Sequence, residues 1–280
     1  MQKSDVLLLV GHGSPNLQGK AEFLQLTQLL TEALRIPIQP CFLESAEPSV
    51  LEAVELCIKE RKATSITVLP VFLNAGIHVK KDIPAFLAEM RTEWSDVQFR
   101  YGTALGSHAA LISSLVERAK EALLTTQSPF SAAETALLVV SFGGSEPDSN
   151  AEIYKIARLL WEKCAYGWVE VAFCSTQTKP DVALGIERSV RLGAKRIIVL
   201  PHLLFTGIML QRVKEQVQKS QDHSPAVEIL IGNHFQNHEG VVKTLIQRYH
   251  EALEGKTMMT CDLCKYHEDH GHHHGHHHHD

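Results

Sequence analysis

Residues 6–14 read Val-Leu-Leu-Leu-Val-Gly-His-Gly-Ser. Five consecutive aliphatic residues predict a strand that is buried on both faces, as in a parallel sheet. His12 follows this strand and so lies at its carboxyl end, the edge where ligands bind in open α/β sheets. Gly11 and Gly13 carry no Cβ and allow a ligand to approach the imidazole closely. On position alone, a structural turn histidine is an equally good interpretation.

Strand and helix patterns alternate through the rest of the first half. Further strands are expected at residues 36–43, 65–70 and 97–101, and helices at 20–35, after a Ser49 N-cap, at 82–91 and at 108–124. Strands separated by helices imply right-handed crossovers and a parallel sheet. The predicted fold class is therefore α/β, with a parallel four-stranded sheet flanked by helices.

The second half repeats the first at an almost constant offset. The matched segments are 6–12 with 136–142 at 130 residues, 70–78 with 201–209 at 131, and 102–108 with 232–238 at 130. A repeat of this length indicates duplicated domains rather than a solenoid. We therefore expect two tandem flavodoxin-like lobes, at 1–125 and 134–254, joined by a polar linker and followed by a tail at 255–280.

Composition excludes several classes of protein. The chain is 44% hydrophobic and 21% charged, and its formal net charge of −5 argues against a nucleic-acid binder. There is no signal-peptide pattern, and the interrupted apolar stretch 197–210 is shorter than the roughly 20 residues of a membrane span. We expect a cytoplasmic protein without a nucleic-acid or membrane partner. Four scattered cysteines are expected to be reduced core thiols: Cys41, Cys57, Cys164 and Cys174.

Comparison of the two halves distinguishes candidate functional residues from residues of the scaffold. His12 and His78 follow the first and third strands, so their loops open on one edge, where two imidazoles can share a metal ion. The matching residues of the second lobe are Phe142 and Met209, which are poor ligands for a borderline divalent metal. We interpret the histidine pair as a metal or catalytic site, although a structural histidine can also be lost on duplication.

Other side chains are expected beside this pair. Glu44 directly follows the second strand and either accepts protons and steers a cation or is a solvated loop residue. Lys80 and Lys81 follow His78 and either form a solvated helix start or contact substrate carboxylates. Ser14 is expected to be a further substrate contact.

Two further histidines occupy matching positions in the two lobes. His108 and His238 lie at helix starts, one in each lobe, which favours capping or packing between the lobes. His108 is also a candidate pocket wall.

No phosphate loop, complete dinucleotide fingerprint or Gly-x-Ser-x-Gly elbow occurs in the sequence. Nucleotide-driven chemistry and acyl-transfer hydrolysis are therefore not expected.

Several motifs resemble those of the sirohydrochlorin cobaltochelatase and ferrochelatase family, the class II chelatases. They are residues 10–14, residues 42–44 with Pro48, and residues 69–84, with 148–152 and 200–207 in the second half. The resemblance covers residues 1 to about 255. It implies two lobes that face each other, the anionic tetrapyrrole sirohydrochlorin in the cleft, and a divalent metal substrate on His12 and His78.

The function implied by the resemblance is metal insertion without ATP, with Glu44 relaying the pyrrole protons. Co²⁺, in cobalamin biosynthesis, is the first choice; Fe²⁺, in siroheme biosynthesis, and Ni²⁺ are alternatives, because imidazole binds all three. A non-catalytic metal- or tetrapyrrole-binding protein is the alternative of another class. Fusion of the lobes implies a monomer with pseudo-twofold symmetry, and Phe142 and Met209 argue against a second active site.

Residues 255–280 are expected to form a separate metal-binding tail. Cys261 and Cys264 are spaced to share one ion or an iron–sulfur cluster. They resemble the cluster segment of some long-form chelatases. A cluster shared between two chains would give a cluster-bridged dimer, which is a further alternative. The alternatives are that the two thiols have no function and that the histidine run is an expression tag. We favour a native metal store, whose candidate ligands are His270, His272, His273, His274, His276, His277, His278 and His279.

Overall fold

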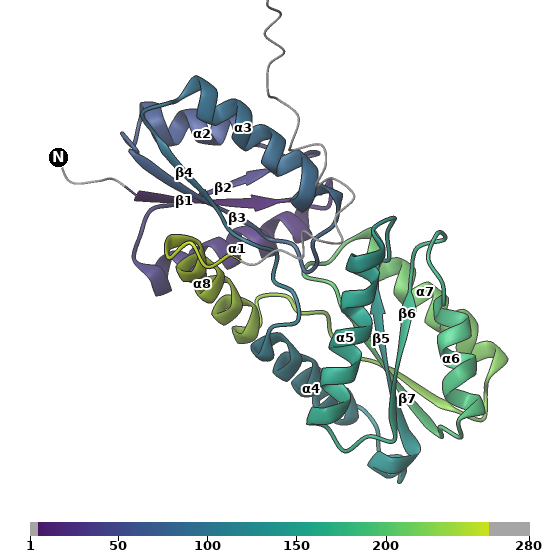
Figure 1. The fold of residues 1–280 in the computed structure, drawn as a ribbon. Helices are drawn as coiled ribbons and strands as arrows, with labels where there is room; N and C mark the ends of the chain where they lie inside the picture. Colours follow the sequence, from purple (N-terminus) through teal and green to yellow (C-terminus); the bar gives the residue numbers. More distant parts are fainter. Residues whose placement is uncertain (1–4, 258–280) are drawn as a thin grey trace, which may run out of the picture.

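The chain forms two lobes, each built on one sheet; the structure, a computed structural model, describes residues 5–257. The first repeat contains β1 (Asp5–Gly11), α1 (Leu17–Leu34), β2 (Ile38–Phe42), α2 (Val50–Lys59), β3 (Ser65–Pro70), the π-helical turn η1 (His78–Asp82), α3 (Ile83–Glu93), β4 (Gln98–Tyr101) and α4 (Ala109–Leu123). After the 3₁₀ turn η2 (Ala132–Glu134), the second contains β5 (Thr135–Ser141), α5 (Pro147–Lys163), β6 (Trp168–Phe173), α6 (Val182–Arg191), β7 (Arg196–Pro201), α7 (Ile208–His223), β8 (Glu228–Ile231) and α8 (Glu239–Leu253). Figure 1 shows the two sheets with helices on both faces of each.

Both sheets are parallel, in the orders β2-β1-β3-β4 and β6-β5-β7-β8. Residues 6–10 of β1 are at most 2% exposed, and residues 136–140 of β5 are fully buried. This burial explains their unbroken aliphatic sequences. β2 is shorter than the expected 36–43, and its Pro40 is tolerated because β2 lies at the sheet edge. The predicted α/β class with two parallel four-stranded sheets is confirmed.

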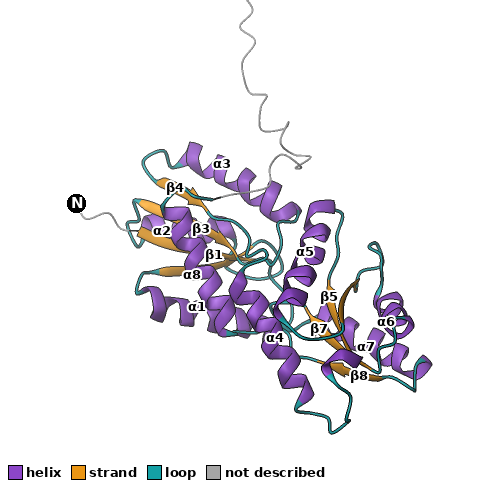
Figure 2. Cartoon of the chain, turned by 60° about the horizontal axis from the view of Figure 1, so that its bottom comes forward, coloured by secondary structure: helices purple, strands orange, loops and turns teal. Residues whose placement is uncertain are grey.

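Helices divide the molecule into layers (Figures 1 and 2). The outer face of the first sheet is covered by α2 and α3, and that of the second sheet by α6 and α7. Between the sheets lie α1, α8, α4 and α5, and the contacts α1–α8, α8–α4 and α4–α5 connect them. One hydrophobic cluster runs through this inner layer, from Leu9 and Leu26 to Leu137 and Leu160. The two lobes therefore share a core.

The last helix of each repeat packs on the sheet of the other repeat. α8 contacts β3 and β4, whereas α4 contacts β7 and β8 (Figure 2). Gly102 and Gly232, which match in the repeat, lie where these helices approach: an added Cβ would be 3.6 and 3.3 Å from the carbonyl oxygens of Arg248 and Arg118. Each sheet thus completes its inner layer with a helix from the other repeat. The sequence boundaries 1–125 and 134–254 stay a prediction.

The polar segment between the repeats is held by hydrogen bonds. Thr126 and Ser128 both donate to the carboxylate of Glu228. The buried guanidinium of Arg196 donates to the carbonyl oxygens of Ser128 and Phe130, at 2.8 and 3.1 Å, and its Nε pairs with Glu228 at 2.5 Å. The connection is therefore fixed against the edge of the second sheet.

The described cysteines are free, as expected from their scattered positions. Cys41, Cys57 and Cys174 are buried, and burial raises the pKa of the Cys57 thiol to about 11. Cys164 differs from the expected core thiol because it caps the end of α5 and is partly exposed. Within residues 5–257, no helix is both long and apolar enough to cross a bilayer.

Candidate functional site

The structure brings together the two histidines that the sequence singled out. His12 follows β1 and His78 follows β3, with ring centroids 4.8 Å apart and ring planes at 86°. Phe72 lies beside both rings, at centroid distances of 6.2 and 6.0 Å. Since a metal–nitrogen bond is about 2.1 Å long, two nitrogens on one ion are at most about 4.2 Å apart. The spacing of the rings is compatible with one shared ion.

A carboxylate lies beside the Nδ1 atom of each ring. Glu44 Oε1 is 3.4 Å from His12 Nδ1, and Asp82 Oδ2 is 2.7 Å from His78 Nδ1. The His12 and Glu44 side chains are 47% and 58% exposed, whereas those of His78 and Asp82 are 33% and 40% exposed. A carboxylate on one ring nitrogen fixes the orientation of the ring and directs the other nitrogen to a metal. Nε2 of each histidine is thus the candidate ligand atom.

Two backbone features place these side chains. Gly13 has φ +97°, and a Cβ there would collide with the carbonyl oxygen of Glu44, so glycine is required where the loops after β1 and β2 meet. The amide of Glu44 also donates to the carbonyl oxygen of His12, at 3.0 Å. In η1 the Ile83 amide donates to the carbonyl oxygen of His78, five residues earlier. Such π-helical turns are frequent at functional sites.

The remaining candidates lie around the pair in different environments. Ser14 is half-buried, and its hydroxyl accepts a 3.1 Å hydrogen bond from the Asn16 amide. Lys81 is exposed. The Lys80 side chain is only 3% exposed and forms an ion pair with Asp148 of α5, in the second lobe. A substrate contact by Lys80 therefore requires this buried ion pair to open.

The second lobe differs at the equivalent positions. The Ser175 amide donates to the carbonyl oxygen of Phe142, as the Glu44 amide does to that of His12, which confirms the alignment of the repeats here. Phe142 is 46% exposed, and Met209 lies in the first turn of α7. Neither side chain offers nitrogen to a metal. Within residues 5–257, no group of three or more His, Cys, Asp or Glu side chains is arranged to hold an ion.

His108 and His238 cap helices and connect the lobes, as expected. Nδ1 of each accepts from a backbone amide in the first turn of α4 or α8, at 3.1 and 3.2 Å. His108 Nε2 is 2.7 Å from Gln247 Oε1 of α8, and His238 Nδ1 is 2.9 Å from Ser114 Oγ of α4. Both rings thus contact the other helix of the α4–α8 pair. The role of His108 as a pocket wall stays a prediction.

Sequence reasoning missed Asp82 and the Lys80–Asp148 ion pair. The spacing of His78 and Asp82, four residues apart at a helix start, is a local signal that was available. Nothing local indicated the partner of Lys80, which comes from the other lobe. Cys261, Cys264 and the tail histidines lie outside the described residues.

Both halves of the chain match one family of known proteins. The sequence pattern of the CbiX family matches residues 6–122 and again residues 136–252. A sirohydrochlorin cobaltochelatase of Priestia megaterium is 36% identical over 261 residues, covering 93% of this chain and 84% of the relative. A sirohydrochlorin ferrochelatase of the same organism is 30% identical over 253 residues, covering 90% and 92%.

Solved structures agree with this result. The structure described as SirB from Bacillus subtilis with Fe³⁺ has a TM-score of 0.78 and 25% identity, and it covers 90% of this chain and 97% of that one. Similarity therefore extends over both lobes and most of each protein. With two matches of the family pattern and relatives at 30% identity or more over most of their length, the chain belongs to the CbiX family of chelatases.

Proposed function

We propose that this protein inserts a divalent metal ion into sirohydrochlorin and that His12 and His78 hold the ion during transfer. The edge-to-face pair of imidazoles, with centroids 4.8 Å apart, is the observation that carries the proposal. Membership of the CbiX family and the names of the two Priestia relatives support the reaction and its substrate. The lobes 1–125 and 134–254 and a monomeric chain are part of the same proposal.

The histidines suit the metal-binding step. His78 Nδ1 is hydrogen-bonded to Asp82, and His12 Nδ1 lies 3.2 Å from the Gly13 carbonyl oxygen and 3.4 Å from Glu44 Oε1, so Nε2 of each ring is left to bind the metal. Neutral imidazole binds Co²⁺, Fe²⁺ and Ni²⁺, so two rings can replace part of the ion's hydration shell before it meets the macrocycle. Both rings are partly exposed, which leaves a route for the ion to enter and leave.

The reaction must also remove two protons from the pyrrole nitrogens. Glu44 lies beside His12, on the exposed side of the pair, and a carboxylate there can accept protons and pass them to water. Charge balance follows, since a dication replaces two protons in the ring. Ser14 and Lys81 are proposed to contact the substrate, Lys81 through its carboxylates.

Co²⁺ is the proposed ion, in cobalamin biosynthesis, because the relative with 36% identity is a cobaltochelatase. The ferrochelatase relative, at 30% identity, makes Fe²⁺ the second candidate. Ni²⁺ is the third, on ligand chemistry alone. The His-rich tail as a metal store, the Cys261–Cys264 cluster and a cytoplasmic location stay predictions.

An assay of turnover separates this enzyme from a binding protein. Sirohydrochlorin in large excess over protein is mixed with Co²⁺, and in parallel with Fe²⁺ or Ni²⁺, and the absorbance of the metallated ring is followed. The proposal predicts many rings metallated per chain, at a rate above that without protein, and fastest with Co²⁺. Spectral change that stops at one ring per chain indicates a binding protein and contradicts the proposal.

A further inference from the structure

The start of α5, in the second lobe, contacts the turn that carries His78. Asp148 lies in the first turn of α5, and its carboxylate forms an ion pair with the ammonium of Lys80, two residues after His78. The Lys80 and Asp148 side chains are 3% and 17% exposed. A buried contact therefore links the second lobe to η1, the turn of the candidate metal site.

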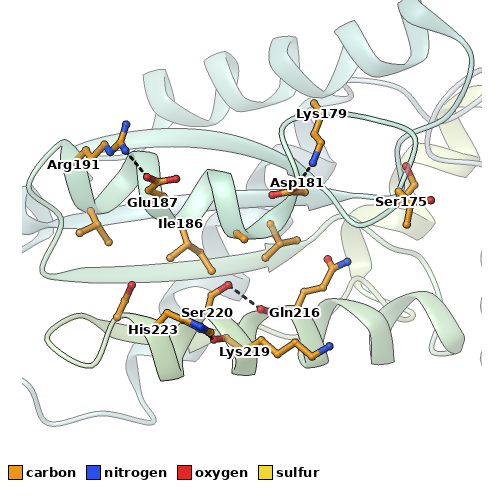
Figure 3. Close-up of a pocket in the computed structure, with 15 residues that line it drawn as sticks. Ser175, Lys179, Asp181, Ile186, Glu187, Arg191, Gln216, Lys219, Ser220 and His223 are labelled. Carbon is orange, nitrogen blue, oxygen red and sulfur yellow. Dashed lines mark hydrogen bonds and ion pairs between the residues drawn. The ribbon is translucent and has the colours of Figure 1, made fainter.

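This ion pair differs from those on the outer face of the second lobe. There Arg191 pairs with Glu187, one turn away in α6, and Lys179 pairs with Asp181, the N-cap of that helix (Figure 3). These four side chains are 34% to 75% exposed, and ion pairs in contact with water contribute little to stability. The pair between η1 and α5 is shielded from water. The attraction between its charges is therefore stronger, and a single charge left there is unfavourable.

The short turn η1 transmits this contact from Lys80 to His78. The Tyr101 hydroxyl, from β4, donates to the carbonyl oxygen of Val79 at 2.8 Å, and the Val79 side chain is fully buried. The amides of Val79 and Lys80 both donate to the carbonyl oxygen of Gly76, at 3.1 Å. Because Val79 joins His78 to Lys80 in this hydrogen-bonded turn, a displacement of the Lys80 backbone also moves that of His78.

The equivalent contact between the lobes is made without charged side chains. At the offsets of the repeat, the ion pair corresponds to Gln211 and Gln18, which are neutral and exposed. The lobes meet there too, because a Cβ on Gly19 would lie 2.6 Å from the carbonyl oxygen of Thr206. Docking of the lobes is therefore compatible with neutral side chains. The buried ion pair occurs at the contact beside the candidate metal site.

We infer that Asp148 is a positioning residue for metal transfer, supplied by the second lobe. Through Lys80 it holds η1, and with it the imidazole of His78, where that ring and His12 can share one ion. His78 depends on such support more than His12, because His12 directly follows β1 whereas residues 71–77 separate His78 from β3. The inference rests on the proposed function, since it concerns the same metal-binding step.

Metal insertion by Asp148→Ala tests the inference. The variant leaves the Lys80 ammonium buried without its partner, so η1 shifts and the two imidazoles no longer fit one ion. With free Co²⁺ set by a metal buffer, we expect KM for Co²⁺ to rise by about tenfold or more, with a smaller change in kcat. Asp148→Glu keeps the charge and should restore most of the wild-type KM.

Glu152→Ala is the matched control for the loss of a contact between the lobes. Glu152 lies one turn further along α5, and its carboxylate accepts from the Ser107 amide of the first lobe at 2.8 Å, after β4 rather than in η1. This variant should keep the wild-type KM for Co²⁺ even where its Tm falls. A rise in KM equal to that of Asp148→Ala would assign the effect to docking of the lobes and overturn the inference.

Lys80→Met tests the same link from the other side. Methionine keeps the length of the buried side chain, and the Asp148 carboxylate it leaves is in partial contact with water, so this variant decides the question if Asp148→Ala does not fold. KM for Co²⁺ should rise here as well. The double variant should raise it no further than Asp148→Ala alone, because both substitutions remove one interaction. Wild-type KM values for Lys80→Met and Asp148→Ala, or effects that multiply in the double variant, overturn the inference.

A titration with Co²⁺ alone separates this inference from the proposed function. Co²⁺ at the histidine pair is measured as the visible absorbance that the wild type shows and His78→Ala lacks. Its midpoint should move to higher free Co²⁺ in Asp148→Ala and stay unchanged in Glu152→Ala. This pattern without turnover by the wild type would contradict the proposed function alone, whereas turnover with an unchanged midpoint in Asp148→Ala would contradict the inference alone.

Discussion

At the scale of single residues, the candidate site depends on how each imidazole is oriented. His78 is held by Asp82 at 2.7 Å, whereas His12 has a longer 3.4 Å contact with the more exposed Glu44. Asp82 is thus the stronger positioning residue. The two carboxylates have different proposed roles: orientation for Asp82 and proton transfer for Glu44.

Replacement of Asp82 by Asn tests the positioning role. The amide removes the charge that orients His78, and loss of such a partner typically weakens metal affinity by about 10–100-fold. We expect KM for Co²⁺ to rise with a smaller change in kcat, and saturating metal to restore most of the rate. Glu89→Gln, on the exposed surface of α3, is the control. An unchanged KM for Co²⁺ contradicts this role.

His202 makes a different contribution, to stability. It is 1% exposed, packs edge-to-face on Phe235 at 5.3 Å, and within residues 5–257 neither ring nitrogen has a hydrogen-bond partner. Burial lowers the pKa of His202 to about 4, from an ordinary 6.5. Between these values the unfolded chain binds a proton that the folded chain does not. The free energy of unfolding therefore falls as pH drops from 6.5 toward 4, by about 3 kcal/mol in total.

The substitution His202→Val tests this pH dependence, because Val71 occupies the equivalent position in the first lobe. The variant should lose the part of the pH dependence that His202 supplies. Urea unfolding at several pH values between about 7 and 5 measures the difference. Parallel pH dependences for the two proteins exclude His202 as the source.

At the scale of elements, local patterns predict much of the fold. The third strand was expected at residues 65–70 and is observed there, and Ser49 forms the expected N-cap, with Glu52 completing a capping box. These features depend on neighbours in sequence. The π-helical turn η1 was not predicted, because its pattern merges with that of α3.

The packing of α4 and α8 on the sheet of the other repeat was not predictable from one sequence. Both helices have an apolar face, and either sheet offers an apolar surface to receive it. The two helices also pack closely on each other, where Gly240 of α8 meets Ala110 of α4. The buried environment of Lys80 was not predictable for a similar reason, because its ion-pair partner, Asp148, belongs to the other repeat.

Gly240→Ala tests how closely the two helices must approach. A Cβ at this position would lie 2.6 Å from the carbonyl oxygen of Ala110, so the helices must move apart. We expect a loss of about 1–3 kcal/mol in the free energy of unfolding, despite the better helix propensity of alanine. Gly144→Ala is the matched control, because an added Cβ there meets nothing within 4 Å. Equal stabilities of the two variants contradict tight packing of α4 on α8.

At the scale of the whole molecule, the duplication is structurally symmetric and chemically asymmetric. The sheets and the capping histidines repeat, and so does the packing of each last helix on the other sheet, whereas the imidazole pair of the first lobe is matched by Phe142 and Met209 in the second. The constant offset between matching segments predicted the two similar lobes. Phe142 and Met209, which replace His12 and His78, predicted that the histidine pair is absent from the second lobe. The candidate metal site therefore lies in the first lobe.

This asymmetry predicts one tetrapyrrole site per chain. Titration of the protein with metal-free sirohydrochlorin, followed by absorbance, should saturate at one molecule per chain. The second lobe has no histidine pair to form an equivalent site. Saturation at two equivalent molecules per chain contradicts a single cleft.

The initial rate of Co²⁺ insertion into sirohydrochlorin by His12→Ala and His78→Ala tests the central claim most directly. Both variants should fall to the rate without protein while keeping the circular dichroism and Tm of the wild type, because both side chains are partly exposed and contribute little to the core. His250→Ala, which removes an exposed imidazole from α8, should keep the wild-type rate. Near-normal rates for both His12→Ala and His78→Ala would show that the metal is transferred elsewhere.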